Sequence, residues 1–129
     1  MAILKSSNWP GLFWTGLIFY VLSMDTQGVG EMSIMKLYGI DKLVHFILFA
    51  VFSLIWTFRL YEKPADHKTW FLLVIVLGAA YGMGMEYYQK FFTNRSFSYW
   101  DGLADALGSV AGAWVAKKSP YGNRGRNQN

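Results

Sequence analysis

Apolar residues in this chain gather in four runs, which are separated by polar and glycine-containing connections. The runs extend over residues 9–24, 43–60, 70–85 and 103–116. Charged residues lie mostly between the runs, an arrangement that a bilayer selects and that the core of a water-soluble protein does not. The pattern therefore predicts an all-α fold, a polytopic membrane protein built as a bundle of four transmembrane helices.

These runs are short for membrane helices, because a hydrocarbon core of roughly 30 Å needs about 20 residues at a rise of about 1.5 Å per residue. To span it, the third helix must extend through Glu86 toward Gln89, and the fourth must begin near Ser98. Asp101 and Asp105 then belong to a helix rather than to a loop. Ser98 and Asp101 also have the spacing of a capping box, in which the hydroxyl accepts an early amide proton.

The first run resembles a signal peptide, because it follows a short N-terminus that carries Lys5. The residues after it, 23–26, lack the small-x-small pattern that signal peptidase needs, so we interpret the run as a retained signal-anchor helix. Pro10 suits the first turn of that helix. We expect residues 1–116 to form a single transmembrane domain, and residues 117–129 to form a basic, disordered cytoplasmic tail.

Composition supports the membrane location and excludes several kinds of site. Of the 129 residues, 53% are apolar and 19% aromatic, which leaves little polar material to cover a soluble globule. The chain has no cysteine, so disulfides, thiolate zinc sites and cysteine nucleophiles are excluded. The formal charge of +4 does not predict nucleic-acid binding, because the basic residues gather at segment ends rather than on one amphipathic face.

The basic residues also predict the orientation of the chain. If it crosses the membrane four times, eight Lys and Arg residues lie on one side and four on the other, so both termini are cytoplasmic. The eight are Lys5, Arg59, Lys63, Lys68, Lys117, Lys118, Arg124 and Arg126, and the four are Lys36, Lys42, Lys90 and Arg95. The extracytoplasmic side receives the acids Asp25, Glu31, Asp41, Glu86, Asp101 and Asp105. Those close to a membrane segment are candidates for a shared site.

Polar residues recur at helical spacing near that side of the membrane. Asp41 and His45 are four residues apart and share one face at the start of the second helix. Gly82, Glu86 and Gln89 share a face at the end of the third. We therefore expect the polar ends of these two helices to converge with that of the fourth.

The fourth helix carries a single stripe that is acidic at its outer end and small at its inner end. The stripe consists of Asp101, Asp105, Gly108 and Gly112. Gly78-x-x-x-Gly82 offers a matching small stripe on the third helix. We predict that the third and fourth helices approach closely there and bring Glu86 beside Asp101 or Asp105.

Taken in order, these motifs resemble the VanZ-like family of membrane proteins. The resemblance covers about residues 12–116 and is carried by Asp41-Lys42-x-x-His45-Phe46, Glu86-x-x-Gln89 and Arg95-x-x-Ser98-x-x-Asp101-x-x-x-Asp105-x-x-Gly108-x-x-x-Gly112. No single motif is specific, whereas the ordered set is. Where that family usually has Asn, this chain has Asp105, which replaces a neutral amide by an ionisable carboxyl.

The resemblance implies a small multi-pass protein of the bacterial cell envelope, placed in the inner (cytoplasmic) membrane. The founding example of the family is associated with low-level resistance to the glycopeptide teicoplanin. The resemblance implies no biochemical mechanism, since one fold hosts several functions.

Several of the polar residues also have a purely structural interpretation. Asp41 can cap the second helix and orient His45. Glu86 and Gln89 can form interhelical hydrogen bonds, worth about 0.6 kcal/mol per contact in a membrane bundle. Arg95 can extend toward lipid phosphates as any loop arginine does.

Three functions stay open at this point. The first is a non-catalytic protein that binds an amphiphile, a lipid-linked envelope precursor or a glycopeptide at the outer leaflet, through Arg95, Lys42, Glu86, Gln89 and Asp101. The second is a membrane enzyme for a lipid phosphate or related ester, with a divalent cation held by Asp41, His45, Glu86, Asp101 and Asp105. The third is a structural or assembly bundle. The chain lacks a nucleophile elbow, a P-loop and an established metal motif, which favours the first over the second, and no cofactor is required by the sequence.

Overall fold

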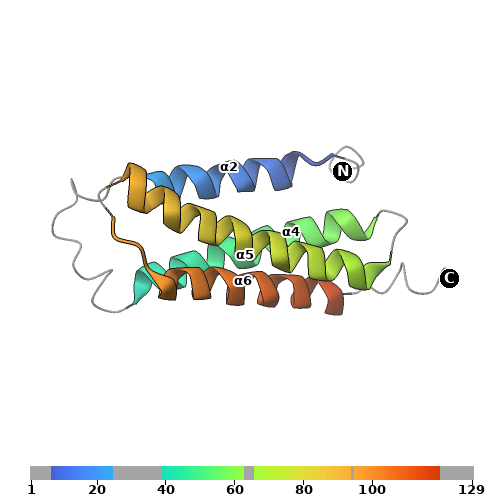
Figure 1. Ribbon diagram of the computed structural model, residues 1–129. Helices are drawn as coiled ribbons and strands as arrows, with labels where there is room; N and C mark the ends of the chain where they lie inside the picture. The colour runs from blue at the N-terminus through green and yellow to red at the C-terminus, as the bar shows by residue number, and fades with distance from the viewer. Residues whose placement is uncertain (1–6, 25–38, 63–65, 94, 120–129) are drawn as a thin grey trace.

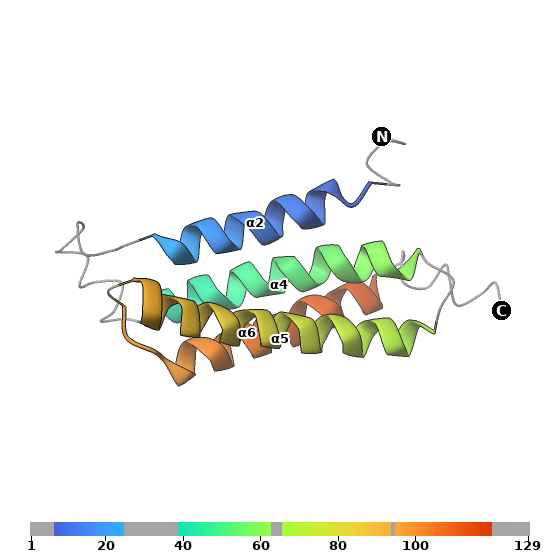
Figure 2. The same ribbon diagram turned by 45° about the horizontal axis from the view of Figure 1, so that its top comes forward.

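Four α-helices make up the regular structure of the described chain, residues 7–24, 39–62, 66–93 and 95–119 of a computed structural model (Figure 1). They are α2 (Trp9–Ser23), α4 (Ile40–Tyr61), α5 (His67–Phe92) and α6 (Tyr99–Lys118). Successive helices run in opposite directions, so α4 and α6 begin at the end of the bundle where α2 and α5 end (Figure 1 and Figure 2). The all-α expectation is confirmed for these residues.

The helix boundaries place the polar residues on helices, as the length of a membrane span required. α5 continues through Glu86 and Gln89 and ends at Phe92. α6 begins directly after Ser98, whose hydroxyl accepts a hydrogen bond from the backbone N–H of Asp101 at 3.3 Å. Because this bond satisfies one of the free amides of the first turn, the expected cap of the fourth helix is confirmed.

The C-terminal end of α6 differs from the expectation. The helix runs two residues beyond Ala116, so Lys117 and Lys118 are helical and do not belong to a tail. The amide of Ser119 bonds to the carbonyl oxygens of Val115 and Ala116, and lysines at a helix C-terminus interact favourably with the helix dipole. Residues 1–6, 25–38, 63–65, 94 and 120–129 lie outside the described part of the chain. The expectations for the rest of the tail and for the charged residues in these stretches therefore concern residues that the structure does not describe.

The start of α5 is set by Asp66. Its side chain accepts hydrogen bonds from the backbone amides of Lys68 at 3.3 Å and Thr69 at 3.2 Å. Hydrogen bonds to the carboxylate favour its charged form, and they lower the pKa of Asp66. α5 therefore begins at His67, ahead of the apolar run that starts at Trp70.

Two of the four helices are long and apolar enough to cross a membrane. These are α4, with 22 residues, and α5, with 26. α2 is apolar but has 15 residues, and α6 carries two aspartates near its start and two lysines at its end. Length and composition thus support two of the four expected membrane spans within the described residues.

α6 packs most extensively against α4, and two glycines make this approach possible. A Cβ atom on Gly108 would meet the carbonyl group of Phe46, and one on Gly112 would meet the carbonyl group of Ala50. Backbone therefore touches backbone along this seam, as it does in small-residue helix contacts generally. Gly108 and Gly112 were expected to face the third helix, and this expectation was wrong.

α5 approaches α6 through its own pair of glycines. A Cβ atom on Gly78 would meet the side chain of Ser109, and one on Gly82 would meet the side chain of Asp105. α6 thus presents its polar positions to α5, while its glycines, three residues further along the helix, turn toward α4. The predicted close approach of the third and fourth helices at Gly78 and Gly82 is confirmed.

We expect Gly112→Ala to lower the midpoint of thermal unfolding of the detergent-purified protein. The new methyl group meets the backbone of Ala50, and forcing an extra methyl into such packing costs about 1–3 kcal/mol. The matched control is Gly84→Ala, because nothing lies within 4 Å of a Cβ there and alanine favours the helix by about 1 kcal/mol. Equal midpoints for the two variants would contradict the close α4–α6 packing.

Candidate functional site

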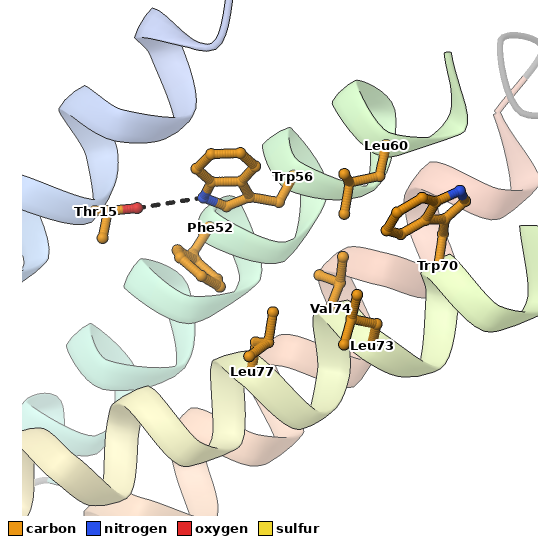
Figure 3. Close-up of a pocket in the computed structure, with 8 residues that line it drawn as sticks. All are labelled: Thr15, Phe52, Trp56, Leu60, Trp70, Leu73, Val74 and Leu77. Atoms are coloured by element: carbon orange, nitrogen blue, oxygen red, sulfur yellow. Dashed lines mark hydrogen bonds between the residues drawn. The ribbon is translucent and has the colours of Figure 1, made fainter. Parts of the chain in front are cut away.

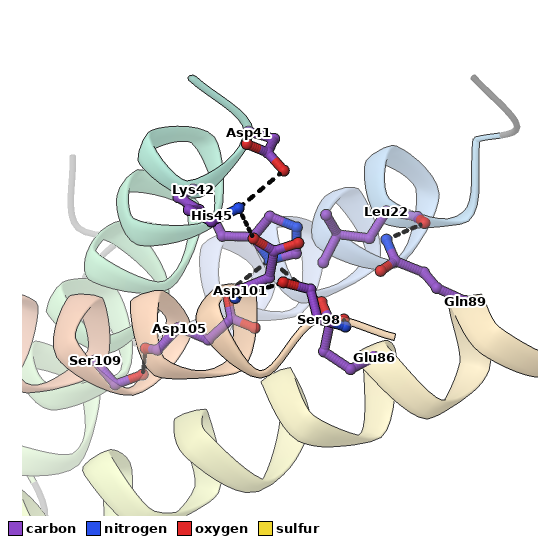
Figure 4. A network of polar contacts seen from close by, with 10 residues as sticks. All are labelled: Leu22, Asp41, Lys42, His45, Glu86, Gln89, Ser98, Asp101, Asp105 and Ser109. Atoms are coloured by element: carbon purple, nitrogen blue, oxygen red, sulfur yellow. Dashed lines mark hydrogen bonds and ion pairs between the residues drawn. The ribbon is translucent and has the colours of Figure 1, made fainter. Parts of the chain in front are cut away.

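Three buried side chains from three helices meet at the end of the bundle where α4 and α6 begin (Figure 4). They are His45 of α4, Glu86 of α5 and Asp105 of α6, which expose 1%, 0% and 0% of their surface. The Nδ1 atom of His45 lies 2.9 Å from Oδ1 of Asp105 and 3.9 Å from Oε1 of Glu86. We call these three residues the buried cluster.

The packing of the helices explains why these side chains converge. Gly82 leaves room on α5 for the side chain of Asp105, one turn before Glu86. The backbone N–H of Ser98 donates to Oε2 of Glu86 at 3.0 Å, so the connection that leads into α6 also holds the Glu86 carboxylate. The hydroxyl of Ser109 donates to the backbone carbonyl of Asp105 at 2.8 Å. Local capping and small residues therefore position the cluster.

Each member of the buried cluster keeps one polar atom without a hydrogen-bond partner in the part of the chain that the structure describes. These atoms are Nε2 of His45, Oε1 of Glu86 and Oδ2 of Asp105. Buried polar groups are normally paired, since leaving one unpaired is costly, and buried charges are paired or bind metal. One ligand atom from each residue lies within 4.8 Å of the other two. An imidazole with two carboxylates suits a divalent cation such as Mn²⁺, Mg²⁺ or Zn²⁺.

A polar hollow of about 240 Å³ lies at the same end of the bundle. Its lining residues are Asp41, Lys42, Arg95, Ser96, Ser98 and Asp101. The Nζ atom of Lys42 lies 3.1 Å from Oδ1 of Asp101 and 3.5 Å from Oδ2 of Asp41. The guanidinium of Arg95 has no hydrogen-bond or ion-pair partner among the described residues. We call this space the anion hollow, because its ammonium, guanidinium and hydroxyl groups are those that bind phosphate oxygens.

The structure separates the predicted polar residues into three groups. His45, Glu86 and Asp105 form the buried cluster, and Asp41, Lys42, Arg95, Ser98 and Asp101 line the anion hollow. Gln89 belongs to neither, because its Nε2 donates to the backbone carbonyl of Leu22 at 2.9 Å and so ties α5 to α2. Sequence reasoning missed Ser96 and the backbone N–H of Ser98. A serine in a loop and a main-chain amide carry no sequence signal of their own.

A second space, of about 330 Å³, lies between α2, α4 and α5 (Figure 3). Its lining residues are Thr15, Phe52, Trp56, Leu60, Trp70, Leu73, Val74 and Leu77. The indole N–H of Trp56 donates to the hydroxyl of Thr15 at 3.2 Å, which uses the polar atoms of both side chains. This apolar wedge has no groups for chemistry, so the candidate site is the buried cluster with the anion hollow.

Comparison with known proteins gives one family and one relative of note. The sequence profile of the VanZ/LLP1 family matches residues 5–119. An uncharacterized protein of the fission yeast Schizosaccharomyces pombe is 32% identical over 93 residues, which is 70% of this chain and 55% of the relative. This chain therefore spans about half the length of that curated relative. No solved structure gives a significant match.

We expect Glu86→Gln to raise the midpoint of thermal unfolding in the presence of a metal chelator. The glutamine still accepts from the amide of Ser98, while one of the crowded buried carboxylates loses its charge. Relieving strain at such a site stabilises a protein by about 1 kcal/mol. The control is Glu62→Gln, an exposed change expected to stay within about 0.5 kcal/mol of the parent. A midpoint below the parent would mean that the native bundle already compensates the charge of Glu86.

Proposed function

This chain belongs to the VanZ/LLP1 family, and from this membership and its buried cluster we propose that it is a membrane enzyme that hydrolyses a phosphate ester of an amphiphilic lipid with the help of a divalent cation. One observation carries the proposal. His45, Glu86 and Asp105 are buried together, each with one ligand atom within 4.8 Å of the other two, and each keeps a polar atom without a hydrogen-bond partner among the described residues. The sequence favoured a non-catalytic protein over this enzyme, and the convergence of these three residues reverses that order.

The charge balance at the site supports a divalent cation. The cluster and the hollow together hold four carboxylates, those of Asp41, Glu86, Asp101 and Asp105. Two cationic side chains, Lys42 and Arg95, oppose them. If every carboxyl is ionised, these groups leave a formal charge of −2, which one divalent cation neutralises. Buried carboxylates without such compensation are costly.

The residues divide the reaction between them. His45, Glu86 and Asp105 would hold a divalent cation, which would polarise a phosphate oxygen and lower the pKa of a bound water. Lys42 and Arg95 bind the remaining phosphate oxygens from the hollow. Asp101 accepts a proton from water as the oxygen of that water forms a bond to phosphorus. The bond between phosphorus and the lipid oxygen breaks, and that oxygen takes up the proton that Asp101 received, so that phosphate and a lipid alcohol leave.

The outer surface of the bundle supports the membrane location. Many large apolar side chains are exposed along the helices, among them Val76, Leu107 and Trp114. Exposed aromatic residues gather near the end that holds the site: Phe91, Phe92, Tyr99 and Trp100. Aromatic belts of this kind lie at the level of lipid headgroups. The phosphate of a lipid in that leaflet then lies at the height of the anion hollow.

The orientation and location expected from the sequence complete the proposal. We propose that all four helices span a bacterial cytoplasmic membrane, with both termini in the cytoplasm and the site at the outer face. The link to glycopeptide resistance rests on the resemblance alone. It therefore stays an expectation outside the proposal.

A second candidate function is a protein that binds the same amphiphile without hydrolysing it. The observation that favours it is the anion hollow, where the guanidinium of Arg95 has no partner among the described residues and has the planar geometry for two phosphate oxygens. Binding alone needs no cation. The two functions therefore differ in their dependence on metal.

We expect the purified protein in detergent to release phosphate from polyprenyl phosphate or phosphatidic acid when Mn²⁺ is present. The rate should fall by about a hundredfold or more in Glu86→Gln and Asp105→Asn, because losing even an outer-shell partner of a metal ligand costs about 10–100-fold. Mn²⁺ should also raise the unfolding midpoint of the parent and not of these variants, by mass action. The variant Glu62→Gln serves as the control.

The outcomes separate the functions left open by the sequence. Stabilisation by the lipid without phosphate release and without a need for Mn²⁺ would contradict the enzyme and favour the binding protein. No response to lipid or metal would contradict both and leave a structural or assembly role for the bundle.

The absence of cysteine in the chain allows a clean test of orientation. We expect Ser96→Cys to react with a membrane-impermeant maleimide in intact bacterial cells, since Ser96 is exposed at the end that holds the site. Lys118→Cys, at the opposite end of α6, should react only after the membrane is opened. The parent chain is the unlabelled control. Labelling of both positions from the same side of the membrane would contradict the proposal that α6 crosses it.

A further inference from the structure

Lys42 lines the anion hollow and contacts Asp101, which lies one helical turn from Asp105 of the buried cluster. Its Nζ atom lies 3.1 Å from Oδ1 of Asp101, and its side chain is 42% exposed while that of Asp101 is 5% exposed (Figure 4). A second carboxylate, that of Asp41, lies 3.5 Å from the same ammonium. Lys42 is therefore a solvent-accessible cation that is paired with the buried carboxylate of Asp101.

The contact between Lys42 and Asp101 is an ion pair without a well-aligned hydrogen bond. Oδ1 of Asp101 is buried and accepts no hydrogen bond of good geometry. The backbone of Asp101 is fixed, because its amide bonds to the hydroxyl of Ser98. Only the side-chain torsions of Asp101 and the flexible stem of Lys42 remain free to change the pair.

Asp101 is placed to serve the buried cluster as well. It precedes Asp105 by one turn of α6, so the two carboxylates share a face of the helix. The connection that holds Glu86 through the amide of Ser98 also leads into the turn that carries Asp101. The carboxylate of Asp101 can therefore pair with either of two cations, the ammonium of Lys42 or a cation bound at the buried cluster.

We propose that Lys42 is a positioning residue that couples the two parts of the site, releasing Asp101 to the cation centre when an anion enters the hollow. The inference rests on the proposed cation site. In the resting state Lys42 holds Asp101, and an anion in the hollow competes for the ammonium. The freed carboxylate then turns toward the cluster, where it strengthens cation binding and stands ready to accept a proton.

This exchange has a thermodynamic consequence that a merely structural ion pair lacks. The anion strengthens binding of the cation, and by linkage the cation strengthens binding of the anion by the same factor. In a site coupled in this way, the cation and the anion bind cooperatively. An anion without the cation, or the cation without an anion, is held less firmly.

The experiment measures Mn²⁺ binding with and without methylphosphonate, an anion whose phosphorus–carbon bond does not hydrolyse. Free Mn²⁺ is followed by electron paramagnetic resonance of the purified protein in detergent. In the parent, saturating methylphosphonate should raise the affinity for Mn²⁺ by about fivefold or more, the lower end of typical coupling. In Lys42→Met the coupling should vanish, and Mn²⁺ alone should bind more tightly than in the parent, because Asp101 is no longer held.

Two further variants sharpen the result. Lys90→Met removes an exposed lysine in the last turn of α5, at the same end of the bundle, and should keep the coupling of the parent. Lys42→Gln repeats the loss of charge with a polar side chain, in case methionine disturbs folding. Lys42→Arg keeps the charge and should keep part of the coupling.

The outcomes distinguish this inference from the function on which it rests. Coupling that persists in Lys42→Met and Lys42→Gln would overturn it, since the anion would then act on the cation directly. Mn²⁺ binding that depends on Glu86 but does not respond to methylphosphonate in the parent would also overturn it while leaving the cation site intact. No Mn²⁺ binding in the parent would remove the proposed function and this inference together.

Discussion

The close approach of α6 to α4 at Gly108 and Gly112 is the constraint from which the rest of the site follows. With backbone against backbone along one side of α6, the helix cannot rotate, so its adjoining face turns toward α5. That face carries Asp105 and Ser109, which meet Gly82 and Gly78. Two glycine pairs on different helices therefore decide which carboxylate enters the core and which neighbour it meets.

Burial of Asp105 then sets the chemistry. In the low dielectric of the core a carboxylate needs a partner, and the one it finds is His45, which brings α4 into the centre. Glu86 completes the group from α5, held from behind by the amide of Ser98. Three buried groups that each keep a polar atom without a partner among the described residues are a poor arrangement for a purely structural core, and their clustered ligand atoms suit a cation.

The anion hollow and the apolar wedge lie at different heights along the proposed membrane normal. Polar and ionisable groups gather at the end where α4 and α6 begin, beside exposed aromatic residues. The apolar wedge between α2, α4 and α5 is lined by side chains whose few polar atoms are already paired or turned away. An amphiphile matches this division, since its charged group needs the first environment and its hydrocarbon the second.

The sequence by itself determined the helical class, the extents of α5 and α6 into their polar residues, the Ser98 cap and nearly all the side chains of the site. These follow from local rules, namely the length of an apolar span, the spacing of turns and the chemistry of a cap. Only the tertiary structure decided that Gly108 and Gly112 face α4, that Gln89 binds α2, and that His45 and Asp41, one turn apart, serve different parts of the site. Helical spacing says which residues share a face, but the partner of that face depends on how the helices rotate about their axes. That rotation is set by side-chain volumes on all of the packed helices together, and no local pattern encodes it.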